Sequence, residues 1–215
     1  MGTSFGALFK ALVQGFQGPG GWSMWAIIIP AMLALAIVFE RFYFLVIKCG
    51  LSRQKFMSDF FQILKTGDHA RALKFAKGFN MPLAKTVAAI IENKDKGEKA
   101  MNKAVDEIFL TETPKVLRYT PQLVMLANVA TLLGLLGTIF GLILAFDAVA
   151  NVPAAQRAQA LATGISVAMA TTFFGLLVGI PTLFAHGVIS AQTDRIIEEM
   201  DEKSSKLINI LIGGE

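Results

Sequence analysis

Three long uncharged stretches alternate with charged ones along the chain, and they predict its main elements. Residues 22–39 form an uncharged run of 18, residues 119–146 a run of 28 and residues 158–193 a run of 36. A helix rises about 1.5 Å per residue, so crossing a bilayer core about 30 Å thick takes roughly 20 apolar residues. Each run therefore predicts a transmembrane helix. The third would be about 54 Å long at this rise, so we expect it to continue beyond the bilayer into water.

The residues before the first run predict a helix on the membrane surface. Their apolar side chains have helical spacing, at Phe5, Leu8, Phe9, Leu12, Val13 and Phe16. A glycine- and proline-rich break follows at 18–21. We therefore expect an N-terminal amphipathic segment at 1–21 and the first transmembrane helix at 22–47. A signal peptide is the alternative, but no small-residue cleavage site follows the apolar run, so we expect this segment to be retained. Glu40 and Arg41 close the run and are interpreted as an interfacial anchor.

The polar part of the chain predicts a cytoplasmic helical domain at 48–118, in which Pro82 and Pro114 are expected to start or break helices and 94–99 to form a solvated turn. The remaining segments are expected to be the second transmembrane helix at 119–147, a periplasmic loop at 148–157, the third transmembrane helix at 158–193 and a charged cytoplasmic tail at 194–215. The predicted fold class is an all-α membrane protein with three transmembrane helices and long cytoplasmic helical extensions.

Composition and charge support this topology. The chain is 54% hydrophobic and 17% charged, with a mean hydropathy of +0.56, which is too apolar for an ordinary soluble domain. Of its 20 Lys and Arg residues, 14 lie between Lys48 and Arg118. Cytoplasmic loops carry such an excess, so we expect a periplasmic N-terminus and a cytoplasmic C-terminus. Topology accounts for the basic charge, and we expect no nucleic-acid partner. Cys49 is the single cysteine, so it cannot form a disulfide within the chain, and it is interpreted as a passive residue at a membrane edge.

Small and hydroxyl-bearing residues line one face of each of the last two predicted spans. The second span carries Thr131, Gly134, Thr138, Gly141 and Ala145, and the third carries Ala168, Thr172, Gly175, Gly179, Thr182 and His186, with Thr171 and Gly164 beside them. Such faces allow close helix packing, which we assign to Gly134, Gly137, Gly141, Ala168, Gly175 and Gly179. Hydroxyl groups can also line a narrow path for water or a small cation. Both interpretations remain open at this point.

The spans that carry these faces have no anionic group of their own. Asp147 lies at the outer end of the second span and Asp194 beyond the inner end of the third. A carrier of protons or cations normally needs a titratable group near the midplane, so a partner chain is expected to supply a carboxylate. His186 is a weaker candidate for a proton relay, since a lone histidine at a helix end more often faces water. We expect no enzyme activity, because no catalytic set, metal cluster or phosphate-binding loop is recognisable.

Two sequence blocks resemble the MotA/TolQ/ExbB proton-channel family. They are Leu132-Leu133-Gly134-Leu135-Leu136-Gly137-Thr138-Ile139-Phe140-Gly141-Leu142 and Gly164-Ile165-Ser166-Val167-Ala168-Met169-Ala170-Thr171-Thr172-Phe173-Phe174-Gly175-Leu176, the latter followed by Gly179-Ile180-Pro181. The three-span order is similar to the ExbB and TolQ branch. The resemblance implies a homopentamer in the bacterial inner membrane around two copies of a single-span ExbD-, TolR- or MotB-like partner, whose aspartate takes up and releases the ion. It places the pore threonines at Thr138 and Thr172.

The resemblance further implies a channel-forming subunit that couples ion flow to mechanical work at the outer membrane or cell wall. A scaffold that oligomerises through its glycine faces without conducting ions is the alternative. Val167 stands where ExbB-type sequences often carry glutamate, so no role of that glutamate is transferred. Thr171 before Thr172 resembles sodium-driven flagellar stators, and a further hydroxyl could help to replace sodium's hydration shell. We expect Thr138, Thr171 and Thr172 to line the ion path, H+ to be the transported ion with Na+ as the alternative, and no cofactor. We also expect membrane lipids to be partners of the protein.

Overall fold

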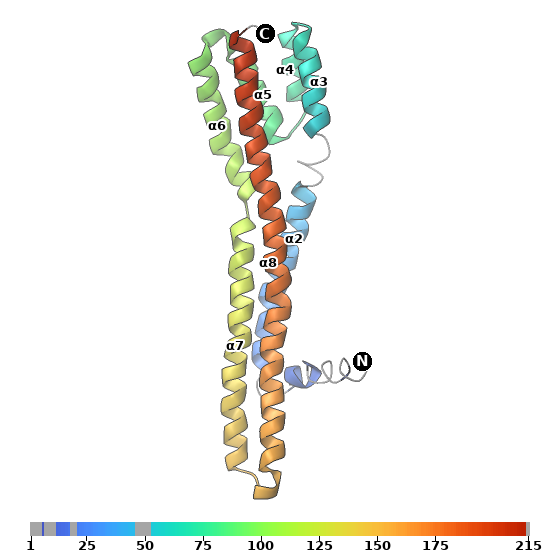
Figure 1. Ribbon diagram of the computed structural model, residues 1–215, viewed down its shortest axis with the longest axis vertical. Coiled ribbons are helices and arrows are strands. Elements are labelled where there is room, and N and C mark those ends of the chain that lie inside the picture. Colours follow the sequence, from blue (N-terminus) through green and yellow to red (C-terminus); the bar gives the residue numbers. More distant parts are fainter. Residues whose placement is uncertain (1–5, 7–11, 18–20, 46–52, 214–215) are drawn as a thin grey trace. The chain divides into compact units, whose positions relative to one another are not determined.

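The computed structural model describes residues 6, 12–17, 21–45 and 53–213, and every regular element among them is helical (Figure 1). The elements are α2 (Gly21–Tyr43), α3 (Arg53–Lys65), α4 (His69–Lys77), α5 (Pro82–Glu92), the 3-10 helix η2 (Lys94–Lys96), α6 (Glu98–Leu117), α7 (Thr120–Ala150) and α8 (Ala154–Gly213). The all-α fold class is confirmed. The predictions for Phe5, Leu8, Phe9, Cys49 and the break at 18–20 lie outside the described residues.

Within the described residues, three segments are long and apolar enough to cross a membrane, namely Gly21–Tyr43, Glu98–Ala150 and Ala154–Gly213. The uncharged part of the second segment lies in α7, because α6 ends at Leu117. The protein is therefore a multi-pass membrane protein. The helices are organised into two compact units, the first made of Met1–Val38 and Pro121–His186 and the second of Phe39–Thr120 and Gly187–Glu215.

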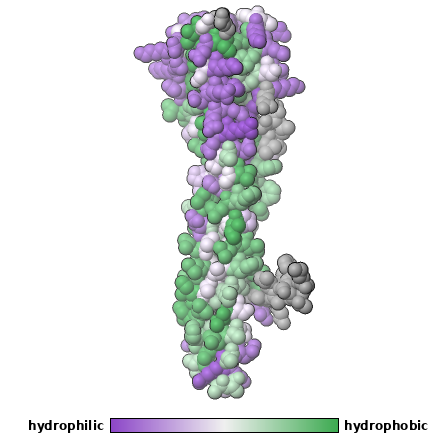
Figure 2. All heavy atoms as spheres, in the orientation of Figure 1, coloured by the Kyte–Doolittle hydropathy of each residue, from purple (hydrophilic) through white to green (hydrophobic). Residues whose placement is uncertain are grey.

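The first unit is built from α2, α7 and α8 lying side by side (Figure 1), with the helical residues 12–17 against them. Aromatic contacts join these elements, because the ring of Trp22 packs on Phe140 at a centroid distance of 5.8 Å and that of Phe16 on Phe174 at 5.3 Å. Large apolar side chains such as Ile143, 59% exposed, point outward. Figure 2 shows hydrophobic residues covering most of the visible face of this unit. Such a surface suits contact with lipid or with neighbouring helices.

The second unit packs α3 to α6 and the C-terminal part of α8 around an apolar core. Its α8 positions Ile196, Met200 and Leu207 are at most 3% exposed. A cluster of rings from α3 and α4 fills the other side, with Phe56 stacked on Phe75 at a centroid distance of 5.5 Å. The visible surface of this unit is mostly hydrophilic (Figure 2), as expected for a part that faces water.

Of the two predictions made for proline residues in this unit, the structure confirms one and contradicts the other. Pro82 occupies the first turn of α5, where its missing N–H costs nothing, so the predicted helix start is confirmed. Pro114 lies inside α6, which continues to Leu117, so the predicted break there is wrong. The proline leaves the carbonyl group of Leu110 without its helical partner, and Leu110 is 78% exposed, so water can replace the lost bond. At the turn before α6, Gly97 has φ +87°, a conformation that favours glycine.

Arg41 is buried instead of anchoring the chain at the membrane interface. Its side chain is 1% exposed and donates hydrogen bonds to the carbonyl oxygens of Val116 at 3.0 Å and Lys115 at 3.3 Å. It also donates to the carboxylate of Glu40 at 2.7 Å, and its guanidinium lies 5.7 Å from the ring centre of Tyr119. An anchor must reach the headgroups, so that interpretation is wrong for Arg41. The carbonyl groups at the end of α6 attract the cation instead, since the helix leaves them without partners.

Candidate functional site

The site lies along the contact between α7 and α8, where glycine residues let the two backbones come close. A Cβ atom on Gly134 would lie 3.0 Å from the carbonyl oxygen of Thr171, and one on Gly175 would lie 2.8 Å from that of Ala130. Toward the loop that joins the helices, a Cβ on Gly141 would lie 2.9 Å from Cβ of Ala168. All three distances are shorter than ordinary van der Waals contact, so larger residues would force the helices apart. The sequence-predicted packing positions thus lie together, and Gly179 lies further along the same contact, against the Ala127 carbonyl.

Thr138 and Thr172 meet across this contact. Their hydroxyl groups form a hydrogen bond with each other. The Thr138 hydroxyl also lies within hydrogen-bond distance of the carbonyl oxygens of Gly134 at 3.2 Å and Ala168 at 3.3 Å, and that of Thr172 lies 3.1 Å from the Gly134 oxygen. The structure therefore brings together the two threonines that the sequence analysis singled out on separate helices.

Thr171 shares the same carbonyl groups. It is fully buried, and its hydroxyl lies 2.7 Å from the oxygen of Ala168 and 3.2 Å from that of Gly134. Each threonine hydroxyl has one proton to donate and two lone pairs that can accept. When the threonine hydroxyls donate their protons to the carbonyl oxygens of Gly134 and Ala168, the lone pairs of the hydroxyl oxygens remain available to a water, a hydronium ion or a small cation. We name Thr138, Thr171 and Thr172 the threonine cluster.

Ser23 of α2 belongs beside the threonine cluster, although the sequence analysis did not select it. It is fully buried, and a Cβ on Gly137 would contact its hydroxyl and would lie 2.8 Å from that of Thr171. Gly137 thus makes room for hydroxyl groups from two other helices at one height. The sequence could have pointed to Ser23, because it is the one residue with a hydroxyl group in the uncharged run at 22–39.

The surroundings of the threonine cluster are uncharged. In the described parts of the first unit, α7 is free of ionisable residues up to Asp147 and α8 is free of them from Ala158 to Ala185. His186 lies 15 positions beyond Thr171 in α8, which is about 22 Å along a helix, so it does not join the cluster. The cluster can therefore solvate a cation with neutral oxygen atoms, while any group that binds and releases a proton has to come from elsewhere.

These features define a class of protein, namely a multi-pass helical membrane protein with a cluster of hydroxyl groups between closely packed helices. Residues 70–202 match the model of the MotA/TolQ/ExbB proton channel family. This match covers more than half of the chain, and the protein belongs to that family.

Three relatives agree with this assignment. A biopolymer transport protein of Synechocystis, named ExbB-like 3, is 25% identical over 178 residues, which cover 82% of this chain and 84% of that protein. The biopolymer transport protein exbB1 of Vibrio cholerae is 35% identical over 92 residues, 43% of this chain and 40% of its own length. An ExbB homologue of Methanothermobacter thermautotrophicus is 27% identical over 139 residues, 64% of this chain and 48% of its own length. The match thus spans less than half of the second and third relatives.

Proposed function

We propose that this protein is the ion-channel-forming subunit of an energy-transducing complex in the bacterial inner membrane. It conducts protons and couples their flow to mechanical work at the outer membrane or cell wall through a single-span, ExbD- or TolR-like partner. The observation that carries the proposal is the threonine cluster, in which Thr138, Thr171 and Thr172 converge on the carbonyl groups of Gly134 and Ala168 in uncharged helices. Family membership and the relatives named as biopolymer transport proteins support it.

The partner's aspartate serves in this proposal as the group that binds and releases the proton. A carboxylate within a membrane needs a polar neighbour, and the threonine hydroxyls can donate to its charged form or accept from its protonated form. The cluster thereby stabilises both protonation states at the same place. Since α7 and α8 carry no carboxylate at this height, the complex cannot transport protons by this route without the partner.

The proposed assembly is a pentamer of this chain around two copies of the partner, with the N-terminus in the periplasm and the C-terminus in the cytoplasm. The concentration of Lys and Arg residues between Lys48 and Arg118 supports this orientation. The exposed apolar side chains of α7 and α8, such as Leu132 at 63% and Leu177 at 51%, are available for contacts with lipid, with other copies and with the partner helix.

Replacement of single hydroxyl groups tests the proposal. Thr138→Val and Thr172→Val keep the side-chain shape but remove the donor and acceptor. Thr182→Val is the matched control, because the Thr182 hydroxyl lies in α8 and donates to the Val178 carbonyl of its own helix at 2.8 Å. We expect the first two variants to lower ion flux through the complex, purified with its partner and reconstituted in vesicles, by about 10- to 100-fold, because a hydrogen bond to a charged group contributes about 1.5–3 kcal/mol.

Assembly must be measured beside flux, because it separates the proposal from the scaffold alternative. The channel proposal expects Thr138→Val and Thr172→Val to assemble with the partner while flux falls, and Thr182→Val to retain both. If all three variants assemble and conduct alike, the threonine cluster does not line the path, and a scaffold that oligomerises through its glycine faces becomes the better account.

A further inference from the structure

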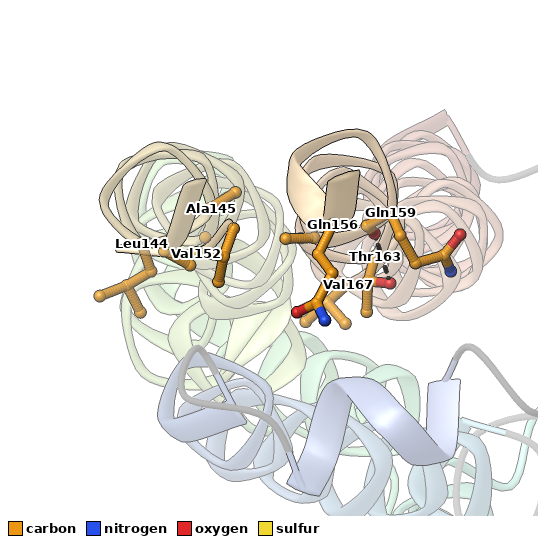
Figure 3. A pocket seen from close by; sticks show the side chains of 11 residues that line it. Leu144, Ala145, Val152, Gln156, Gln159, Thr163 and Val167 are labelled. Carbon is orange, nitrogen blue, oxygen red and sulfur yellow. Dashed lines mark hydrogen bonds between the residues drawn. The ribbon is translucent and has the colours of Figure 1, made fainter. Parts of the chain in front are cut away.

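Two cavities of the protein differ in the side chains that line them. The groove beside the loop between α7 and α8 is lined by apolar and neutral polar residues, such as Val152, Gln156 and Thr163 (Figure 3), and none of the described residues along it is ionisable. A pocket of about 600 Å³ in the second unit is instead lined by apolar and ionisable side chains together. Pockets of roughly 300–1,000 Å³ that combine an apolar wall with a few polar groups are typical sites for small molecules. We name this second cavity the α3–α8 pocket.

The apolar wall of the α3–α8 pocket comes from the two helices that give it its name. Phe61 and Leu64 lie on α3, and Ile210 and Leu211 lie in the last turn of α8. Leu64 is 8% exposed and belongs to the core, whereas the other three side chains are half-buried. Apolar surface that water still reaches is stabilised when another apolar group covers it. This wall therefore favours a ligand with an apolar part.

Cationic side chains lie at the edge of this wall. Lys65 ends α3 and is exposed, and Lys94 begins η2. The ammonium group of Lys94 is 4.0 Å from the carboxylate of Asp95, which is 88% exposed, so water weakens this pair. The carboxylate of Asp68, beside the pocket in sequence, is already used, because it accepts a hydrogen bond of 2.9 Å from the N–H of Arg71 as the N-cap of α4. The lysine charges are thus only partly balanced, and the pocket favours an anion.

His69 brings an unsatisfied polar atom to the same pocket. It is the first residue of α4, and its Nδ1 is buried without a hydrogen-bond partner among the described residues. A buried polar atom without a partner costs free energy. An imidazole can carry a proton on Nδ1, so an anionic oxygen in the pocket would supply the missing acceptor. Three elements, α3, α4 and η2, thus each present a donor to one space.

The position of the pocket along α8 favours a soluble ligand over a lipid. Leu211 lies 18 positions beyond Thr193, where the uncharged run ends, and this is about 27 Å along a helix. The polar headgroup layer of a bilayer is only about 5–8 Å thick on each side. A headgroup near the end of the uncharged run therefore does not reach the pocket.

We propose that the α3–α8 pocket binds a small, soluble organic phosphate with an apolar body. A phosphate monoester carries up to two negative charges, and its three free oxygen atoms can accept hydrogen bonds from Lys65, Lys94 and His69 at once. The apolar body packs on Phe61 and Leu211. This site goes beyond the proposed function and does not depend on it, because none of these residues belongs to the threonine cluster.

Binding of 1-naphthyl phosphate tests the inference. The full-length protein in phosphatidylcholine nanodiscs is titrated by calorimetry at about 0.15 M salt, with empty nanodiscs as the blank. We expect saturable binding of one molecule per chain. Inorganic phosphate should bind at least about tenfold more weakly, because it has no apolar body to cover the wall. Lys65→Met and Lys94→Met should each weaken binding of the naphthyl ester about tenfold, since each removes a charged donor. His69→Phe, which keeps a ring but removes Nδ1, should weaken it severalfold.

Lys96→Met is the matched control for the lysine variants. Lys96 lies in the same 3-10 helix as Lys94, and its removal changes the charge of the protein equally. Its ammonium group donates to the side-chain oxygen of Asn93 at 2.9 Å, and it does not line the pocket. This variant should bind the naphthyl ester as the unmodified protein does.

Four results would overturn the inference. Absence of saturable binding would show that the pocket takes no such anion. Equal affinities of Lys94→Met and Lys96→Met would show that only overall charge attracts the ester. Equal affinity for inorganic phosphate would show that the apolar wall contributes nothing. Loss of binding in phosphatidylglycerol nanodiscs would show that lipid headgroups occupy the site, since charges about 27 Å away are screened at a Debye length of about 8 Å.

Discussion

Arg41 donates a hydrogen bond of 3.0 Å to the carbonyl oxygen of Val116, 75 positions further along the chain. The acceptor lies in the last turn of α6, which ends at Leu117, and α7 begins at Thr120. Between them, Tyr119 has φ +64°, the one positive value among the described non-glycine residues. A guanidinium from α2 thus supplies the donors that the interrupted helix lacks, and it holds the end of α6 beside the end of α2.

Replacing this guanidinium should destabilise the second unit. In Arg41→Met the carbonyl groups of Lys115 and Val116 lose their donor inside the protein, which typically costs about 1–3 kcal/mol. Arg118→Met is the control, because Arg118 is exposed and its guanidinium interacts with the neighbouring Tyr119, whose ring centre lies at 4.4 Å and whose hydroxyl accepts a hydrogen bond from it. Thermal unfolding of the detergent-solubilised protein should show a clear decrease in Tm for the first variant and little change for the second. Equal midpoints would show that water satisfies these carbonyl groups as well as Arg41 does.

Replacing the helical glycines Gly175 and Gly187 with alanine should change the stability of the protein in opposite directions. A Cβ on Gly175 would lie 2.8 Å from the Ala130 oxygen and 3.0 Å from Cα of Gly134, both backbone atoms that cannot move without separating the helices. We expect Gly175→Ala to cost roughly 1–3 kcal/mol, as overpacking does. A Cβ on Gly187 meets nothing within 4 Å, so Gly187→Ala should stabilise α8 by about 0.5–1 kcal/mol. Unfolding measured in detergent under identical conditions checks both signs, and a stabilised Gly175→Ala would contradict the close approach of α7 and α8.

These residues show which parts of the fold and of the site can be predicted from the sequence and which cannot. The three spans follow from charge-free runs, and the glycine and threonine spacing placed Thr138 and Thr172 on facing surfaces before any contact was known, because helical periodicity is a local property. The Arg41 contact could not be predicted in this way. Its acceptors are backbone carbonyl groups, which every residue carries, so nothing in the sequence marks residues 115 and 116 as its partners. Ser23 was missed for a related reason, since its contact depends on which face of α2 meets Gly137.

Stability of the second unit should fall at acidic pH through Glu112. This carboxylate is 7% exposed and bonded to Lys115 at 2.7 Å and Lys85 at 3.1 Å. Burial alone would raise the pKa of Glu112, but the hydrogen bonds and charges of the two lysines outweigh it and hold the pKa below its ordinary value of 4.5. Because the folded-state pKa is the lower one, the ion pairs contribute their full stability above the ordinary value. That contribution is lost as the pH falls from there through the folded-state pKa.

The Glu112→Gln variant tests this pH dependence. It should be less stable than the unmodified protein at neutral pH, and the difference should shrink as the pH falls from about 4.5 through the lower folded-state pKa, where Glu112 becomes protonated and neutral like glutamine. Glu107→Gln in the same helix is the control, because Glu107 is exposed. Midpoints of thermal unfolding across pH 3 to 7 give the comparison. A constant difference between Glu112→Gln and the unmodified protein would show that the lysine contacts do not favour the charged carboxylate.

The identity of the ion should be visible in the sodium dependence of flux. Sodium sheds its hydration shell only where several oxygen atoms replace the water, whereas a proton passes with a carboxylate and a single water. Residues 70–202 match a family described as proton channels, and the Thr171 hydroxyl, which donates to the Ala168 carbonyl at 2.7 Å, keeps lone pairs that serve a proton carrier as well as a sodium ion. We therefore expect the reconstituted complex to conduct equally when sodium is replaced by choline, and Thr171→Ala to leave this independence unchanged. Flux that requires sodium, and that falls selectively for sodium in Thr171→Ala, would identify the doublet of Thr171 and Thr172 as a sodium site and exclude protons as the coupling ion.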